Sequence, residues 1–127
     1  MSHPADITLR PAAEDDRSFL LRVYAESRAE ELAATGWSNQ EKAAFLAGQF
    51  DAQDAHYRRH FPDCEFLIVE RDGVPVGRLY RDRRHDEIRV VDIALLEEER
   101  GRGIGGALMQ AVLAEAVSAG FTVRIHV

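Results

Sequence analysis

The chain has 127 residues, of which 46% are hydrophobic and 30% are charged, and this size and composition are typical of one soluble globular domain with its own core. Its formal net charge of −6 argues against a general nucleic-acid-binding protein, because such proteins carry a basic surface. The single cysteine, Cys64, rules out an internal disulfide and fits a reducing compartment.

Two short stretches decide the expected location of the protein. Residues 1–6 lack the basic and apolar regions of a signal peptide. The longest apolar window, Val90 to Leu96, contains Asp92 and is too short to span a bilayer. We therefore expect a cytoplasmic protein that does not act on membranes. Cys64 begins an apolar run, so we expect a small buried side chain there rather than a nucleophile.

The first half of the chain predicts one short strand and two helices. An apolar alternation over residues 7–11 indicates the strand, and acidic residues near the start favour a helix over about 13–34. Ser38, followed three residues later by Glu41, is typical of the capping box of a second helix over about 39–59. The inner stripe of the first helix comprises Leu20, Val23, Tyr24 and Ser27.

The second half predicts three antiparallel strands, a helix and a last strand. The segments CEFLIVERDGVPVGRLYRD and DEIRVVDIALL contain the three strands, and Asp72 with Gly73 supplies a tight hairpin turn. A helix is expected over about 103–119, followed by a strand over 121–127. The order is β-α-α-β-β-β-α-β, an α+β fold in one domain spanning 1–127. The fourth and fifth strands are joined by a helical crossover and should lie parallel.

The segment EEERGRGIGG, residues 97–106, joins the fourth strand to the following helix. A helix N-terminus carries unpaired N–H groups and partial positive charge, so it attracts phosphate oxygens. Its glycines remove the Cβ atoms that would hold a ligand away from this backbone, and Arg100 and Arg102 add donors for a polyanion. The segment therefore predicts a diphosphate-binding site.

Glycine-rich segments also serve other functions. A Walker loop requires Lys and Ser or Thr after its last glycine, whereas Ala107 and Leu108 follow Gly106 here. The dinucleotide pattern G-x-G-x-x-G is matched, but the second βα unit and its acidic residue are missing from this sequence. A glycine-rich turn that only lets the helix and strand pack is the remaining structural alternative.

The segment ERGRGIGGALM resembles the coenzyme A signature of the GCN5-related N-acetyltransferases (GNAT), (Gln/Arg)-x-x-Gly-x-(Gly/Ala), here Arg100 to Gly105. The preceding VVDIALLEEE is similar to the fourth strand of that family. The order of elements also matches the family's fold along the whole chain. The resemblance implies a GNAT-like mixed sheet and transfer of an acetyl group from acetyl-CoA to a primary amine, by direct attack in a ternary complex.

The resemblance also implies which residues hold acetyl-CoA, with no metal involved. The pantetheine arm would pair with the backbone of Ile93, Ala94 and Leu95 as though it were an added strand. The diphosphate would be held by the N–H groups of Arg100, Gly101, Arg102, Gly103, Ile104, Gly105, Gly106 and Ala107.

For the chemistry, the N–H of Leu95 is expected to stabilise the oxyanion. His126 is the first candidate for the base that deprotonates the amine, and Asp92 is the second. A packing or surface role for His126, and a hydrogen bond or charge pair for Asp92, are the structural alternatives. Deprotonation through water without a dedicated base also remains open.

The sequence ends before the C-terminal helix and last strands of the family. In that segment the family places the tyrosine that acts as the general acid and protonates the departing thiolate. Either the chain is shortened, or a partner chain completes the sheet. The last strand is apolar and nearly uncharged, so two copies of the chain could associate through its edge. Tyr57 and Tyr80 are not expected to replace the missing acid.

The acceptor is expected to be a small-molecule or peptide amine, with no nucleic acid or membrane involved. The acidic pair Glu30 and Glu31 could attract a cationic amine, although a solvated helix face is the alternative. Side chains that could line the acceptor pocket are Trp37, Gln53, Tyr57 and Tyr80. The alternative function is a non-catalytic acyl-CoA-binding module or sensor.

Overall fold

The computed structural model describes residues 6–125 of the chain. Its elements, in chain order, are β1 (Ile7–Pro11), the 3₁₀ turn η1 (Glu14–Asp16), α1 (Arg17–Ser27), α2 (Ala29–Ala33), α3 (Asn39–His60), β2 (Cys64–Arg71), β3 (Val74–Arg83), β4 (Glu87–Leu95), the 3₁₀ turn η2 (Glu97–Glu99), α4 (Ile104–Ala119) and β5 (Thr122–Ile125). Within this part of the chain, no helix is long and apolar enough to cross a membrane.

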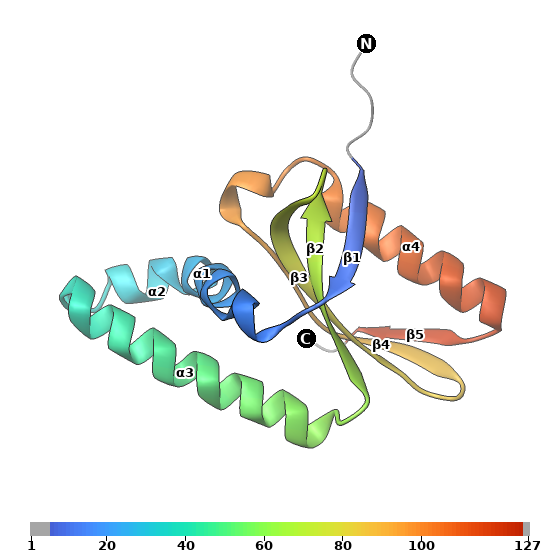
Figure 1. Ribbon diagram of the computed structural model, residues 1–127, viewed down its shortest axis with the longest axis horizontal. Helices are drawn as coiled ribbons and strands as arrows, with labels where there is room; N and C mark the ends of the chain where they lie inside the picture. The colour runs from blue at the N-terminus through green and yellow to red at the C-terminus, as the bar shows by residue number, and fades with distance from the viewer. Residues whose placement is uncertain (1–5, 126–127) are drawn as a thin grey trace, which may run out of the picture.

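The five strands form one mixed sheet in the order β1-β2-β3-β4-β5 (Figure 1). The first three pairs of neighbours are antiparallel, and β4 and β5 are parallel. The parallel pair confirms the prediction from the helical crossover, and the α+β class and mixed sheet are likewise confirmed. The β2–β3 hairpin turns at Asp72 and Gly73, also as predicted, with Arg71 paired to Val74.

Helices cover both faces of the sheet, with α4 on one face and α1 to α3 on the other (Figure 1). The α4 face holds the larger core, in which the helix packs against apolar side chains of the strands. The residues of α4 that are buried there are Ile104, Leu108, Val112 and Ala116. This four-residue spacing is the apolar stripe of a helix on a sheet, and it fixes which side of α4 faces the strands.

The single helix expected over residues 13–34 is wrong, because this stretch forms η1, α1 and α2. The break lies at Arg28, where φ is −108° and ψ is 5°. The hydroxyl of Ser27 donates to the carbonyl of Tyr24 at 2.6 Å, and the N–H of Arg28 bonds to the carbonyl of Ala25. These i→i−3 bonds replace the next helical turn. Ser27 is exposed, so it does not continue the buried stripe.

Helix α3 begins as the sequence predicts. The N–H of Glu41 donates to the hydroxyl of Ser38 at 3.1 Å, and the N–H of Ser38 donates to the carboxylate of Glu41 at 3.1 Å. This reciprocal pair satisfies two donors that would otherwise be unpaired at the helix start. The helix is 22 residues long, and its second half reaches β4 through the hydrogen bond from Tyr57 to Asp92, where the candidate site is found.

The connection from β1 to α1 is held by a buried acid. Arg10 donates both terminal nitrogens to Asp16 at 2.8 Å and its Nε to Glu70 at 3.0 Å. Asp16 also accepts the N–H of Ala13 at 2.8 Å. The hydrogen bond from Arg10 is the main reason why the pKa of Asp16 is lowered to about 2. This network fixes where α1 starts relative to the sheet.

Candidate functional site

A β-bulge in β4 determines which face of the sheet carries Asp92. Tyr80 of β3 pairs with Asp92 of β4. The next pair along the strands joins Arg81 to Val90, which leaves Val91 as an extra residue on β4. Val90 packs in the core under α4, whereas Val91 packs on the opposite face. An extra residue reverses the alternation of faces, so Asp92 also faces α3 instead of lying under α4.

A cavity of about 530 Å³ lies between α3 and the end of the β4–β5 pair. Polar groups come from α3 and from the bulged part of β4, and apolar side chains of both strands form the rest of the wall. The lining residues are Gln53, His56, Tyr57, Val90, Val91, Asp92, Ile93 and Ile125. The cavity is therefore a mostly apolar pocket with a few convergent polar groups, as is typical of small-molecule sites.

Asp92 is held by two donors from different elements. Arg78 of β3 donates to its Oδ2 at 2.6 Å, and the hydroxyl of Tyr57 on α3 donates to the same oxygen at 2.9 Å. Arg78 is only 3% exposed and also donates to the amide oxygen of Gln53 at 3.1 Å. Asp92 is therefore the counter-charge that makes burial of this arginine tolerable. Burial, and after it the charge of Asp92, raises the pKa of the Tyr57 hydroxyl well above its ordinary value.

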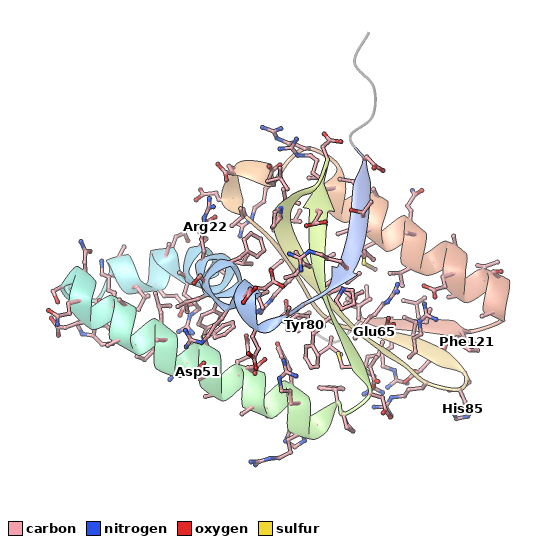
Figure 2. All side chains as sticks on the ribbon, viewed as in Figure 1. Arg22, Asp51, Glu65, Tyr80, His85 and Phe121 are labelled. Atoms are coloured by element: carbon pink, nitrogen blue, oxygen red, sulfur yellow. The ribbon has the colours of Figure 1, made fainter. Side chains whose placement is uncertain are left out.

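Aromatic rings pack against the residues that hydrogen-bond Asp92. Tyr80 is 2% exposed, and its ring contacts the ring of Tyr57 edge-on at a centroid distance of 5.7 Å. Figure 2 shows Tyr80 near the middle of the molecule, between the sheet and α3. The guanidinium of Arg78 lies 4.8 Å from the centre of the same ring. Tyr80 is thus a packing residue beneath the cavity.

The edge of β4 beyond the bulge exposes backbone groups on the side away from β3. The described part of β5 pairs with β4 only as far as Val90 and Ile125. The N–H of Leu96 donates to the carbonyl of Val76 on β3 at 2.9 Å. The carbonyl of Leu95 must then point the other way, and it accepts Nε of Arg100 at 3.3 Å.

Alternation along the strand extends this result to the neighbouring residues. In an extended strand, the N–H and C=O of one residue share a side, so the N–H of Leu95 also points away from β3. Ile93, two residues earlier, shares that side. Ala94 faces β3 instead, and its carbonyl lies opposite Gly77. Of the three residues predicted to pair with pantetheine, only Ile93 and Leu95 therefore have backbone groups on the side away from β3, and the prediction is reduced to these two.

The loop from η2 to α4 turns through two glycines with positive φ. Gly101 has φ of +76° and Gly103 has φ of +80°, and no side chain caps the helix that starts at Ile104. The N–H groups of the first helical turn have no intrahelical acceptor. The N–H of Ala107 donates to the carbonyl of Gly103, and the N–H of Arg100 donates to Glu97. The N–H groups of Arg100 and Ala107 are therefore already used within the protein, and the predicted diphosphate donors are reduced to the N–H groups of residues 101–106.

Gly105 and Gly106 have no structural reason to be glycine. Neither has a positive φ, and a Cβ built on either would meet nothing within 4 Å. Glycine in a helix costs about 0.5–1 kcal/mol relative to alanine. Glycine at these positions leaves the backbone at the N-terminus of α4, the positive end of the helix, without a covering side chain. These residues therefore fit a ligand whose phosphates approach the helix closely.

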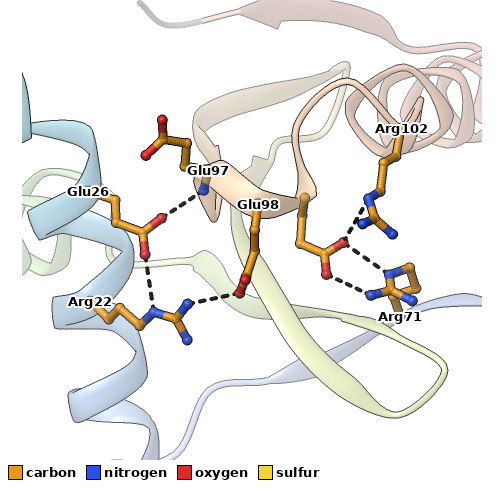
Figure 3. A network of polar contacts seen from close by, with 7 residues as sticks. Arg22, Glu26, Arg71, Glu97, Glu98 and Arg102 are labelled. Atoms are coloured by element: carbon orange, nitrogen blue, oxygen red, sulfur yellow. Dashed lines mark hydrogen bonds and ion pairs between the residues drawn. The ribbon is translucent and has the colours of Figure 1, made fainter.

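The turn η2, which leads into this loop, is tied to the rest of the protein on two sides (Figure 3). On one side, Glu26 of α1 accepts the N–H of Glu97 at 2.7 Å, and Arg22 pairs with Glu98 at 2.9 Å. On the other side, Arg71 of β2 binds both carboxylate oxygens of Glu99. The start of the loop is thus held in place before any ligand binds, which lowers the entropy cost of binding.

The structure brings together some predicted site residues and separates others. Asp92 and the Leu95 backbone lie on the same stretch of β4, which leads to the glycine loop. His126 lies outside the described residues. Gln53 and Tyr57 line the cavity, whereas Trp37 lies before α3, where its ring contacts Phe45 at 5.2 Å.

Sequence reasoning missed His56, Arg78 and Glu99. His56 follows Gln53 by three residues on α3 and lines the same cavity, so helical spacing from Gln53 could have indicated it. Arg78 and Glu99 are buried charges whose partners are distant in sequence. No local pattern indicates such pairs.

Cys64 has no place in the site chemistry. It is half-buried and packs against a cluster of Phe61, Tyr80 and Val91. Burial raises the pKa of its thiol to about 12. The thiolate, which is the nucleophilic form, is therefore disfavoured at neutral pH. The side chain is thus half-buried where the sequence predicted a buried one, and its apolar neighbours fit the expected packing role.

Sequence comparison matches residues 32–127 to the profile of the acetyltransferase (GNAT) family. Comparison with curated proteins gave no match. Solved structures are similar over nearly the whole chain. A PaiA N-acetyltransferase from Thermoplasma acidophilum, in complex with coenzyme A, has a TM-score of 0.64 and 17% identity, with 96% of this chain and 79% of that chain covered.

Two further solved structures show the same likeness. A GCN5-related N-acetyltransferase from Rhodopseudomonas palustris has a TM-score of 0.56 and 24% identity, with 97% of this chain and 76% of that chain covered. The Ard1 protein of Thermoplasma volcanium has a TM-score of 0.57 and 23% identity, with 94% and 70% covered. At these identities, the structural likeness concerns the fold.

Proposed function

The chain belongs to the acetyltransferase (GNAT) family, and we propose that it transfers the acetyl group of acetyl-CoA to a primary amine by direct attack in a ternary complex. The observation that carries this proposal is the uncovered first turn of α4, where Gly105 and Gly106 leave the backbone bare. The similar protein from Thermoplasma acidophilum was crystallised with coenzyme A, which supports the choice of ligand.

The N–H groups of residues 101–106 would hold the diphosphate, with Arg102 adding a charged donor. The pantetheine arm would then run along the edge of β4 and pair with Ile93 and Leu95. That edge leads from the glycine loop toward the cavity at Asp92. The thioester would therefore reach the mouth of the cavity, while the amine occupies the cavity itself.

In the reaction, the amine nitrogen attacks the thioester carbon, and the carbonyl electrons move onto oxygen. The N–H of Leu95 would stabilise this oxyanion, because it points away from β3 and has no strand partner on that side among the described residues. Collapse of the tetrahedral intermediate re-forms the carbonyl and expels the thiolate. The amine gives up one proton to a base, and the thiolate takes up one proton.

His126 remains the first proposed base, and Asp92 the second. Asp92 lies in the cavity, but its Oδ2 is bonded to Arg78 and Tyr57, so its role as a counter-charge is sufficient to explain it. Proton transfer through water to either group, or with no dedicated base, is the third route.

A non-catalytic acyl-CoA-binding module is the alternative proposal. One observation favours it: Asp92 and Tyr57, two titratable groups of the cavity, are bonded to each other. The hydroxyl of Tyr57 is also a weak acid here, because its pKa is raised. The Tyr57 hydroxyl and Oδ2 of Asp92 are therefore both engaged before any substrate binds.

The test is release of free thiol from acetyl-CoA across a panel of amines: an aminoglycoside, a polyamine, free amino acids, and peptides with a free N-terminus or lysine. The enzyme proposal predicts release above the amine-free rate with at least one class. Binding of coenzyme A without release from any amine would instead support the binding module. Failure to bind coenzyme A would contradict both.

A further inference from the structure

Three consecutive acids, Glu97 to Glu99, stand immediately before the loop to which we assign the diphosphate. Carboxylates beside a polyanion raise the free energy of the bound state, because like charges repel strongly when they are shielded from water. The ion pairs of these acids therefore matter for ligand binding as well as for folding. Figure 3 shows that arginines from two other elements approach them.

Glu99 is the least exposed of the three acids, so water screens its charge least. Its side chain is 8% exposed, against 64% for Glu98. Arg71 neutralises it in a two-pronged pair, with Nη2 at 2.7 Å from Oε1 and Nε at 3.1 Å from Oε2. The hydrogen bond from Arg71 is the main cause of the lowered pKa of Glu99, so this carboxylate is ionised at neutral pH.

A second arginine, Arg102, forms a longer ion pair with the same carboxylate (Figure 3). Nε of Arg102 lies 3.9 Å from Oε2 of Glu99, beyond hydrogen-bond distance, and its side chain is 57% exposed. Both oxygens of Glu99 are already taken by Arg71. The guanidinium of Arg102, next to Gly103 at the start of α4, is therefore left available to an incoming anion.

We propose that Arg71 is a positioning residue for the cofactor site: by hydrogen-bonding both oxygens of the buried Glu99 carboxylate, it limits Arg102 to a longer ion pair that the diphosphate can displace. This inference rests on the proposed function of the glycine loop. Arg71 itself lies on β2, 28 positions from Glu99 in sequence, and acts on the ligand only through Glu99 and Arg102.

The inference predicts opposite results for the two partners of one ion pair. In Arg71→Met, the buried carboxylate loses its partner and captures Arg102, so coenzyme A should bind about tenfold more weakly, as for the loss of one charge-assisted contact. In Glu99→Gln, no charge remains to capture Arg102, and affinity should be unchanged or higher. The double variant Arg71→Met/Glu99→Gln should regain wild-type affinity to within about threefold.

A purely structural role of the Arg71–Glu99 ion pair predicts a different pattern of coenzyme A affinities. If the Arg71–Glu99 pair only held the loop in shape, both single variants and the double variant would bind coenzyme A more weakly. Dependence on Arg102 gives a second readout. Arg71→Met should add little to the loss caused by Arg102→Met, because both changes remove the same contact.

The experiment is calorimetric titration of coenzyme A into the wild type and these variants, with S-acetylpantetheine as a phosphate-free probe. Affinity for S-acetylpantetheine should not change in Arg71→Met. Arg17→Met, which removes an exposed ion pair with Asp51 and changes the net charge equally, is the matched control and should bind coenzyme A as the wild type does.

Wild-type affinity in Arg71→Met, or a tenfold loss in Glu99→Gln, would overturn the inference and leave the proposed function intact. Absence of coenzyme A binding to the wild type would overturn both. If Arg71→Met does not fold, Glu99→Gln and the double variant still decide the matter, since weak binding by either contradicts the inference.

Discussion

The hydroxyl of Tyr57 donates a 2.9 Å hydrogen bond to the carboxylate of Asp92, joining α3 to β4 at the wall of the cavity. The same carboxylate oxygen accepts from the buried guanidinium of Arg78. Helix α3 is therefore fastened to the sheet at the place where we propose that the acceptor binds. The bulge at Val91 makes this contact available, because it turns Asp92 toward α3.

The ion pair between Arg78 and Asp92 should contribute more to stability than the hydrogen bond from Tyr57 to Asp92. Asp92→Asn leaves Arg78 buried without a counter-charge and should lower the free energy of unfolding by about 3 kcal/mol. Tyr57→Phe removes one hydrogen bond but leaves the ion pair and should cost about 1 kcal/mol. Urea unfolding of both variants measures the difference. Equal losses would contradict the assignment of Asp92 as the counter-charge of Arg78.

Gly106→Ala should separate stability from ligand binding. A Cβ meets nothing within 4 Å in the protein, so the free energy of unfolding should rise by about 0.5–1 kcal/mol. The same Cβ would stand between the backbone and the phosphates, so affinity for coenzyme A should fall at least about tenfold, or roughly 1.4 kcal/mol. Gly105→Glu, which adds bulk and negative charge, should abolish binding.

Gly48→Ala is the matched control for this prediction. Gly48 is an exposed helical glycine of α3 with nothing within 4 Å of a built Cβ. This variant should gain similar stability without any change in affinity. Thermal unfolding and calorimetric titration of both variants give the two numbers. If Gly106→Ala bound coenzyme A normally, the predicted site of the diphosphate would be incorrect.

Gly77→Ala should damage the edge of β4. A Cβ at Gly77 would lie 2.4 Å from the carbonyl oxygen of Ala94 and 3.1 Å from Cα of Leu95. Backbone atoms cannot move aside as a flexible side chain can, so β3 and β4 must separate locally. We expect a loss of about 3 kcal/mol in the free energy of unfolding. A loss below 1 kcal/mol in urea unfolding would show that the strands are less tightly apposed.

Acid should weaken the β1–α1 connection through Asp16. Its pKa is lowered from 3.8 to about 2 by Arg10, so ionised Asp16 stabilises the fold. This stabilisation is complete above about pH 4 and is lost as the pH falls through about 2. The stability difference between the wild type and Asp16→Asn should be largest at pH 7 and should shrink toward pH 2. Asp51→Asn, at an exposed ion pair, should show a small difference throughout.

Local sequence signals predicted most of the architecture. The four-residue spacing of Ile104, Leu108, Val112 and Ala116 gave the buried face of α4 correctly. The pair Ser38 and Glu41 gave the start of α3 to the residue. Such signals succeed because they depend on contacts within one turn of helix. The break at Arg28 was missed, since it depends on a competing bond from the Ser27 hydroxyl, which spacing alone does not reveal.

The site was predictable only where its function depends on backbone. The glycine loop can be recognised from its residue types, because backbone without side chains at a helix start requires glycine. The network around Asp92 does not, since Arg78 and Tyr57 reach it from other elements. The bulge at Val91 was equally hidden: it depends on the register between β3 and β4, which neither strand specifies alone.

The most direct test of the central claim is a titration of the isotope-labelled protein with coenzyme A, followed by the amide N–H resonances. The account predicts that the largest shifts fall on residues 101–106, with further changes at Ile93 and Leu95. Saturable binding that leaves the amides of residues 101–106 unchanged would contradict it.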